Sequence, residues 1–189
     1  QGDVIVKEFG IARISTGDLL RKEISNNTEL GGQVKDTLAS GKLVSNDIIM
    51  SLIKQEISKH IDKGFVLDGV PRNIEQAKDI DVFLQSRFQK HIDLVLSLEI
   101  PESKLIERLS SRFYCNECNE SYNKIYKMPK IENTCDVCGS HDFMTRSDDN
   151  EEVIKERYRL YENETMPILS YYDAKKAVCK IDAENDVKN

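Results

Sequence analysis

Residues 64–72 of the chain read Gly-Phe-Val-Leu-Asp-Gly-Val-Pro-Arg. Three consecutive apolar residues between turn residues are typical of a short strand buried on both faces, as in parallel sheets. In open α/β sheets, ligands bind beyond the carboxyl ends of such strands. There Gly69 would let a ligand approach the backbone, Arg72 offers a planar fork to phosphate, and Asp68 can hold magnesium through water. An ordinary strand-to-helix turn would read the same way, so this segment needs support from the rest of the chain.

Helical and extended patterns alternate on both sides of this segment. Apolar spacing, capping residues and glycine stops predict helices over residues 1–9, about 15–26, 28–40, 46–60, 73–89, 101–112 and 150–172, and strands over 11–14, 65–67, 94–98 and 178–181. The run 94–98 again reads as a buried strand. Asp149 and Glu152 are spaced as a capping box at the start of the last helix, which Pro167 should kink. Strands alternating with helices predict an α/β fold, a parallel sheet flanked by helices.

Composition and charge bound the class of function. Of 189 residues, 39% are apolar and 32% are charged, which is too apolar for a disordered chain and too charged for a membrane protein. No apolar run approaches the ~18 residues of a membrane span, and the start lacks a signal-peptide pattern. The formal net charge of −6 speaks against a nucleic-acid partner. We therefore expect a cytoplasmic protein that binds neither nucleic acid nor membrane.

Four cysteines lie close together in a polar, turn-rich segment, residues 113–147. Cys115-x2-Cys118 is followed after 16 residues by Cys135-x2-Cys138. Two such turns facing each other offer four thiolates in a tetrahedron, which suits zinc, and a sulfur-only site has no open position for substrate. The spacing therefore predicts a structural zinc site, against the alternative of four unrelated thiols. His141 is a possible replacement ligand, whereas Cys179, in a predicted strand, reads as an ordinary core thiol.

Several basic residues could form an anion site. Lys104, Arg108 and Arg112 fall at i, i+4 and i+8 of the predicted helix 101–112 and would form one basic stripe. A solvated helix face is the plainer reading of such a stripe. If the arginines gathered near one sheet edge, however, they would form a clamp for polyphosphate. The arginines in question are Arg72, Arg108, Arg112, Arg146 and Arg157.

Several motifs taken together resemble the adenylate kinase family. They are residues 14–21 (Ile-Ser-Thr-Gly-Asp-Leu-Leu-Arg), 41–44 (Gly-Lys-Leu-Val), 64–72, Gln76 and Arg146-x-Asp148-Asp149, and the four cysteines match the subtype with a zinc-bearing lid. The resemblance implies a P-loop-type core formed by residues 1–14, 45–110 and 150–189. It also implies an AMP-binding helical arm at 15–44 and a lid at 111–149. The implied reaction is reversible phosphoryl transfer from ATP to AMP, giving two ADP, by a monomer that uses Mg²⁺ with ATP.

The resemblance also assigns roles to individual residues. It implies AMP contacts from Thr16, Arg21, Lys42, Leu43, Val44, Gly69, Val70, Pro71, Arg72, Gln76, Arg146 and Arg157. It implies ATP contacts from Arg112, Ser121, Tyr122 and Asn185. Catalysis would rest on Arg72, Arg108, Arg112, Arg146 and Arg157 around the phosphates, with Asp68, and also Asp148 and Asp149, placing magnesium or the closed lid. Arginines suit this chemistry because phosphoryl transfer asks for positioning and fixed positive charge.

Two departures from the family pattern stand out. Val70 replaces the usual Phe, for which we expect a local packing change only. The family's Gly-rich phosphate loop, with its Lys, would immediately precede the position of Gln1. A chain that truly began at Gln1 is expected to be inactive, because backbone donors and the Lys of that loop would be missing. We expect the natural protein to encode the loop.

Other readings of the sequence remain open. A pyrimidine monophosphate kinase is one, although Thr16 and the long zinc lid argue against it. A GTP-dependent adenylate kinase and a catalytically dead nucleotide-binding remnant are two more. Residues 113–147 could also be a zinc ribbon that binds nucleic acid, but the segment lacks a basic excess. Its lysines and tyrosines are Lys124, Lys127, Lys130, Tyr122 and Tyr126, and its acidic residues include Glu117, Glu120 and Glu132.

Overall fold

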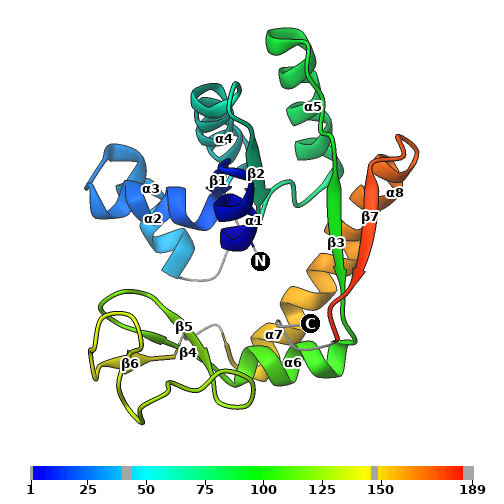
Figure 1. Ribbon diagram of the computed structural model, residues 1–189. Coiled ribbons are helices and arrows are strands. Elements are labelled where there is room, and N and C mark those ends of the chain that lie inside the picture. Colours follow the sequence, from blue (N-terminus) through cyan, green and yellow to red (C-terminus); the bar gives the residue numbers. More distant parts are fainter. Residues whose placement is uncertain (1, 40–43, 146–148, 185–189) are drawn as a thin grey trace. The chain divides into compact units, whose positions relative to one another are not determined.

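The computed structural model describes residues 2–39, 44–145 and 149–184, which divide into two units (Figure 1). Unit 1 comprises residues 1–93 and 164–177, and unit 2 comprises residues 94–163 and 178–189. The predicted AMP-binding arm falls within unit 1 and the predicted lid within unit 2. The division into core, arm and lid stays a prediction. Among the described residues, no helix combines the length and the apolar character that crossing a membrane requires.

Unit 1 contains one parallel strand pair and most of the helices. Its elements are α1 (Gly2–Phe9), β1 (Ala12–Ser15), α2 (Thr16–Ser25), α3 (Glu29–Ala39), α4 (Asn46–His60), β2 (Phe65–Asp68), α5 (Ile74–Phe88) and α8 (Met166–Asp173). β1 runs parallel to β2, with Ala12 opposite Phe65 and Ser15 opposite Asp68. The carboxyl ends of both strands therefore lie at one edge, and Thr16 and Gly69 follow directly.

Among the described residues, a large apolar cluster lies in the core of unit 1. In α4, Ile49, Ile53 and Ile57 recur every four residues, so they share one helix face, and each is buried. Burying an isoleucine side chain stabilises a fold by about 1.5–3 kcal/mol. The buried members of the cluster are Ile14, Leu20, Val34, Val44, Ile49, Met50, Ile53, Ile57, Val70, Ile80 and Leu84. The expected apolar stripe of helix 46–60 is confirmed.

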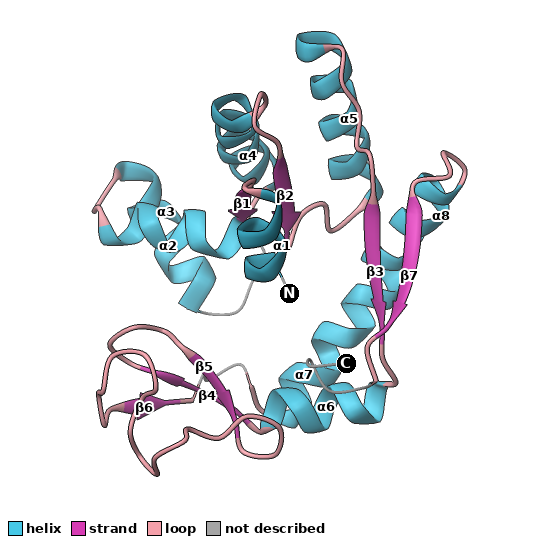
Figure 2. Ribbon diagram, in the orientation of Figure 1, coloured by secondary structure: helices cyan, strands magenta, loops and turns pink. Residues whose placement is uncertain are grey.

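Unit 2 contains a second parallel pair and a small antiparallel sheet (Figure 2). Its elements are β3 (Val95–Glu99), α6 (Glu102–Ser110), β4 (Arg112–Cys115), β5 (Ser121–Asn123), β6 (Phe143–Met144), α7 (Glu151–Leu160) and β7 (Val178–Asp182). β3 runs parallel to β7, and β4 lies between β5 and β6. The predicted α/β fold with parallel strands and flanking helices is confirmed.

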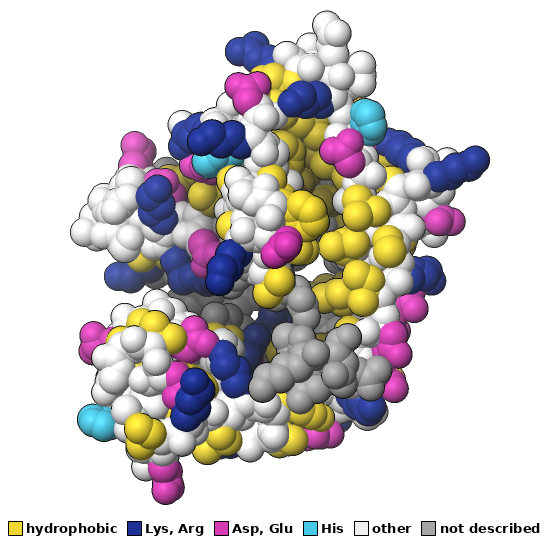
Figure 3. Space-filling model, viewed as in Figure 1, with side chains coloured by type: hydrophobic (Ala, Val, Ile, Leu, Met, Phe, Trp, Pro, Cys, Tyr) yellow, Lys and Arg dark blue, Asp and Glu magenta, His cyan; other side chains and the backbone are white. Residues whose placement is uncertain are grey.

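The prediction of a buried strand at residues 94–98 is wrong. Leu94, Leu96 and Leu98 are 57%, 41% and 48% exposed, whereas Ser97 is buried. The three leucines share one face of β3, because side chains alternate along a strand. In register, Leu96 lies opposite Cys179 and Leu98 opposite Ile181, and these partners are exposed too. Figure 3 shows apolar side chains gathered there. Cys179 is therefore an exposed thiol and not a core thiol.

The predicted helix 101–112 ends early, and this changes the place of Arg112. α6 stops at Ser110, Ser111 caps it, and Arg112 begins β4. The expected stripe of Lys104, Arg108 and Arg112 on one helix is therefore wrong. The physical reason is local: two serines are poor helix continuers, whereas the aromatic residues after Arg112 favour a strand.

The predicted helix 150–172 is interrupted. α7 ends at Leu160, residues Tyr161–Thr165 form a π-helical turn, and α8 begins at Met166. Pro167 has no N–H for the carbonyl four residues before it, and its ring pushes that carbonyl away. A wider turn accommodates both effects, so the disturbance expected at Pro167 takes the form of a π turn.

The start of α7 corrects the predicted capping box. Asn150 is the N-cap, and its side chain accepts a hydrogen bond from the Val153 N–H at 3.0 Å. Asp149 is not the cap, because its carboxylate is buried and binds Arg112. A capping Asp and a capping Asn look alike in sequence, so the pattern alone does not decide between Asp149 and Asn150.

Candidate active site and metal site

Unit 1 brings four of the predicted AMP residues together beyond β1 and β2. Thr16 starts α2, is buried, and donates a hydrogen bond from Oγ1 to the carbonyl of Gly69 at 3.3 Å. Arg72 donates from Nε to the same carbonyl at 2.8 Å. Gly69 has φ +76°, a left-handed conformation that glycine adopts without a side-chain clash. The turn after β2 therefore depends on this glycine and is tied to both Thr16 and Arg72.

Gln76 fixes the main chain of Arg72. Its side chain is buried, and Oε1 accepts a hydrogen bond from the Arg72 N–H at 2.7 Å. Its Nε2 donates to Asn46 Oδ1 at 2.8 Å, and its own N–H donates to Asn73 Oδ1 at 2.9 Å. Asn73 is thereby the N-cap of α5. Neither asparagine was predicted as a site residue, although an Asn directly before an apolar helical pattern, as at Asn73, signals a cap.

The remaining AMP-side residues of unit 1 take different places. Val44 and Val70 are buried in the core, and Pro71, half-buried, follows Val70 through a cis peptide bond. Arg21 is exposed and forms an ion pair with Asp18 in the first turns of α2. Burial raises the pKa of Asp18, but hydrogen bonds from the Arg21 and Ser15 side chains outweigh that effect, so the pKa lies below its usual value.

Asp68, expected near magnesium, binds Arg13, which was not among the predicted site residues. Arg13 donates to Asp68 Oδ2 from Nε at 3.0 Å and from Nη2 at 2.6 Å. A Cβ on Gly2 would lie 3.2 Å from Arg13 Nε, so the absence of a side chain on Gly2 leaves room for the arginine. No local sequence pattern marks this pair, because it depends on the parallel register, in which Arg13 lies opposite Val66 and Ser15 lies opposite Asp68.

In unit 2, Arg112 is bound to a buried carboxylate. Its Nε donates to Asp149 Oδ2 at 3.0 Å and its Nη2 to Oδ1 at 2.6 Å, a bidentate pair. The Asp149 side chain is 3% exposed and that of Arg112 is 22% exposed. The guanidinium also lies 5.3 Å from the Tyr114 ring centroid. Asp149 thus holds the charged end of Arg112 in one orientation.

Arg108 and Arg157 belong to unit 2 as well. Arg108 donates to the carbonyls of Ala183 and Glu184 at 2.7 and 2.8 Å, and lies 5.1 Å from the Tyr126 ring centroid. Arg157 lies in the last turn of α7. The polyphosphate clamp stays a prediction, because Arg72 belongs to unit 1. Five residues with predicted roles lie outside the described residues: Lys42, Leu43, Arg146, Asp148 and Asn185.

The four cysteines converge in unit 2. The Sγ atoms of Cys115 and Cys138 are 3.4 Å apart, those of Cys118 and Cys135 are 3.5 Å apart, and all four lie within 4.8 Å of one another. Sulfurs around a tetrahedral zinc, with bonds of about 2.3 Å, are about 3.8 Å apart. The four cysteines could therefore hold a zinc ion. His141 is not in this group of ligand atoms, and its Nδ1 donates to the Asn133 carbonyl at 2.7 Å.

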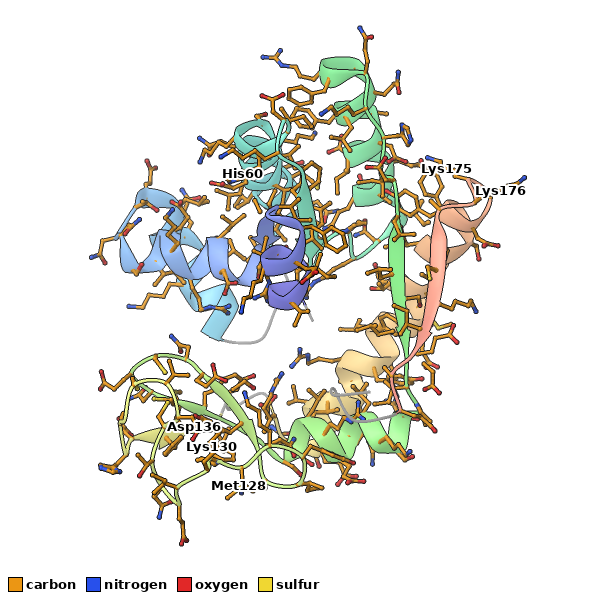
Figure 4. The ribbon with its side chains drawn as sticks, viewed as in Figure 1. His60, Met128, Lys130, Asp136, Lys175 and Lys176 are labelled. Atoms are coloured by element: carbon orange, nitrogen blue, oxygen red, sulfur yellow. The ribbon has the colours of Figure 1, made fainter. Side chains whose placement is uncertain are left out.

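Local turns position these thiols. In each Cys-x2-Cys segment the carbonyl of the first cysteine accepts a backbone hydrogen bond at 2.9 Å from the residue four positions on. Those residues, Asn119 and Gly139, have φ +58° and +75°. Asn and Gly adopt this left-handed conformation more readily than other residues. Both turns therefore point their two thiols to one side. Figure 4 shows Lys130 and Asp136 nearby, where the Lys130 N–H donates to Asp136 Oδ1 at 3.0 Å.

Tyr122 belongs to the cysteine cluster. It is 1% exposed, its hydroxyl donates to Cys135 Sγ at 3.4 Å, and it accepts from the Asp136 N–H at 2.7 Å. Burial and the hydrogen bond to Cys135 raise the pKa of Tyr122 to about 12. Burial raises the pKa of Cys135 too, but hydrogen bonds from Tyr122 and from two backbone N–H groups lower it to about 6. Of the predicted ATP pair, Ser121 is exposed on β5, whereas the side chain of Tyr122 is buried.

This α/β protein has a glycine–arginine loop after a parallel strand, arginines held by carboxylates, and a four-cysteine module. Together these features are typical of a nucleotide-binding phosphotransferase. The comparisons narrow this class. Residues 1–177 match the family model described as adenylate kinase. The chain is 43% identical over 176 residues to the adenylate kinase of Caldicellulosiruptor bescii, covering 93% of this chain and 81% of that protein.

Two further relatives agree. The chain is 38% identical over 188 residues to the adenylate kinase of Enterococcus faecalis, covering 99% of this chain and 87% of that protein. It is 39% identical over 188 residues to that of Methanosarcina barkeri, covering 99% and 86%. The chain therefore belongs to the adenylate kinase family.

Proposed function

We propose that the chain catalyses reversible phosphoryl transfer between ATP and AMP to give two ADP. As a member of the adenylate kinase family it is a phosphotransferase. The observation that carries the proposal is the linked group of Thr16, Gly69, Arg72 and Gln76 in unit 1, which supports a site for a nucleoside monophosphate.

Thr16 supports adenine as the base of the acceptor. Its hydroxyl hydrogen is directed at the Gly69 carbonyl, so its lone pairs remain to accept from a ligand. Adenine carries an amino donor at N6, whereas uracil carries a carbonyl at the matching position. Gln76 supports the same reading, since its amide retains a second N–H and a second lone pair beyond its bonds to Asn46 and Arg72.

The phosphates would be bound by arginines. Arg72 would bind the phosphate of AMP, because its guanidinium is directed by the Gly69 carbonyl on a loop at the carboxyl edge of the sheet. Arg112, with Ser121 and the main chain of Tyr122, would bind ATP from unit 2. Arginines stay charged at every physiological pH, so the developing charge of the migrating group is met without proton transfer.

Two metals complete the proposal. Cys115, Cys118, Cys135 and Cys138 would hold one structural zinc, whose closed sulfur shell leaves no position for substrate. Mg²⁺ would enter with ATP, where it neutralises charge on the β- and γ-phosphates. Both contacts from Arg13 fall on Oδ2 of Asp68, so Oδ1 can accept a hydrogen bond from a metal-bound water.

The test is a substrate matrix with protein expressed from its complete coding sequence. AMP, CMP and UMP are offered as acceptors with ATP or GTP as donor, and ADP formation is followed by a coupled assay. The proposal expects the highest kcat/KM for AMP with ATP. Comparable turnover of UMP would instead indicate a pyrimidine nucleotide kinase, and no turnover of any pair would indicate a binding protein. Sedimentation of the same sample tests the expected monomer.

A further inference from the structure

A hydroxyl far along the chain contacts the loop from Gly69 to Arg72 in unit 1. Thr165 Oγ1 donates a hydrogen bond to the carbonyl of Arg72 at 2.9 Å, across 93 residues of sequence. Both residues belong to unit 1. Thr165 is the last residue of the π turn and directly precedes α8. No sequence motif used above includes it.

With this hydrogen bond, the carbonyl, the N–H and the side chain of Arg72 each have a hydrogen-bond partner. The Arg72 N–H donates to Gln76 Oε1 at 2.7 Å, and its Nε donates to the Gly69 carbonyl at 2.8 Å. Arg72 lies between β2 and α5, outside both elements. Side chains from two different segments hold its N–H and its carbonyl, and each contact removes freedom from the loop that carries the guanidinium.

The π turn explains why the hydroxyl reaches the loop. In a regular helix a threonine hydroxyl commonly bonds a carbonyl of the preceding turn. Here the wide turn before Pro167 ends at Thr165, and the hydroxyl bonds outside its own helix. Single π turns inside helices recur at functional sites.

α8 is itself anchored, which gives Thr165 a defined position. Tyr171 donates from Oη to Asp81 Oδ2 at 2.8 Å, Tyr172 donates to Asp81 Oδ1 at 3.3 Å, and Lys175 forms an ion pair with the same carboxylate. Asp81 lies on α5, the helix that begins just after Arg72. Figure 4 shows Lys175 after the end of α8. The helix is thus fixed to α5 at one end and to the Arg72 loop at the other.

We propose that Thr165 is a positioning residue for Arg72. Its hydroxyl holds the Arg72 carbonyl, and through it the orientation in which the guanidinium meets the phosphate of the monophosphate acceptor. The inference rests on the proposed function, in which Arg72 binds that phosphate. It assigns the π turn a role in acceptor binding and none in donor binding.

The test compares three variants of the full-length protein with the natural protein. Thr165→Val removes the hydroxyl at nearly constant shape, Thr165→Ser keeps the hydroxyl, and Tyr171→Phe loosens α8 without touching the Arg72 loop. Isothermal titration with AMP alone measures the acceptor Kd, and steady-state kinetics measure KM for AMP and for ATP. Thr165→Val should raise the Kd and KM for AMP about three- to tenfold, as expected for one neutral hydrogen bond. KM for ATP should stay unchanged, and Thr165→Ser should restore AMP binding to within about twofold.

Three results would overturn the inference. One is equal AMP binding by the Val and Ser variants. Another is equal weakening of AMP and ATP, and a third is a Tyr171→Phe effect on AMP as large as that of Thr165→Val, which would assign the effect to helix docking. If Thr165→Val fails to fold, Thr165→Ala is compared with Thr165→Ser by the same criteria.

An Arg72→Ala arm separates this inference from the proposed function. If Arg72→Ala leaves AMP binding intact, the proposed acceptor site itself is wrong. If Arg72→Ala abolishes AMP binding and Thr165→Val does not weaken it, only the positioning role of Thr165 fails.

Discussion

Arg13 holds Asp68 by a single carboxylate oxygen: its Nε lies 3.0 Å and its Nη2 2.6 Å from Oδ2. The two side chains are 33% and 46% exposed, so the pair contributes little to stability, under about 1 kcal/mol. Its consequence is electrostatic. A fixed positive charge stands beside the carboxylate that the proposed function assigns to a magnesium-bound water.

Arg13→Gln should therefore ease the use of magnesium. Removing the positive charge leaves Asp68 more attractive to a divalent cation, so the free Mg²⁺ giving half-maximal rate should fall about two- to fivefold, which corresponds to under about 1 kcal/mol. Initial rates at fixed nucleotide and varied Mg²⁺ measure this. Lys54→Gln, which breaks the comparable Lys54–Asp79 pair at 2.8 Å, is the control and should leave the magnesium requirement unchanged. An unchanged or weaker response of the Arg13 variant to Mg²⁺ would contradict the assignment of Asp68.

Two arginine variants should separate activity from stability. Arg72→Ala and Arg112→Ala should each lower kcat by about two to three decades, as for loss of one positioned donor at a transition state. Arg72 is exposed, so its removal should change the free energy of unfolding by under about 1 kcal/mol. Arg112→Ala strands the buried Asp149 carboxylate and should cost about 1–3 kcal/mol.

Chemical denaturation tests the difference between the two arginines. Adding Asp149→Asn to Arg112→Ala should recover part of the lost stability but none of the activity, because no buried charge is then left without its partner. Equal destabilisation by Arg72→Ala and Arg112→Ala would show that the Arg112–Asp149 pair has no structural weight.

Thr16→Ala should weaken the preference for bases that carry an amino group over bases that carry a carbonyl. The hydroxyl accepts from an amino group once its hydrogen is engaged by Gly69, so kcat/KM should fall about three- to tenfold for AMP and for CMP. UMP has a carbonyl at that position and should lose nothing. Ser58→Ala removes a hydroxyl that bonds the Lys54 carbonyl at 2.8 Å on the surface of α4, and it serves as the control. Equal losses for AMP and UMP would argue against contact between Thr16 and the base.

Metal analysis tests the cysteine cluster. Protein purified without chelator should contain one zinc per chain, and exhaustive chelation should lower the thermal midpoint, because ligand binding stabilises the state that binds. Cys118→Ser should lose zinc, whereas Cys179→Ser, which alters an exposed thiol outside the cluster, should keep it. A chain that lacks zinc as purified, or that unfolds at the same temperature after chelation, would exclude a structural zinc.

The local features of this protein were determined by its sequence alone. The helix 46–60 was predictable because its isoleucines repeat every four residues, and the cysteine cluster because Cys-x2-Cys turns carry their geometry within five residues. The loop from Gly69 to Arg72 was predictable because a strand followed by glycine and arginine places those groups at a sheet edge. Each of these signals lies within a few neighbouring residues, where backbone sterics and spacing act directly.

Tertiary structure alone decided which side chains meet across long separations. Arg13 and Asp68 are 55 residues apart in sequence, and the register of β1 and β2 brings them into contact. Thr165 contacts Arg72 because a π turn and an anchored α8 place its hydroxyl there. Asp149 resembles a helix cap in sequence, but it is buried against Arg112, and Asn150 is the N-cap. The exposure of Leu94, Leu96 and Leu98 was equally hidden, since an apolar run specifies that a strand can be buried, whereas the packing of other elements decides which of its faces is covered.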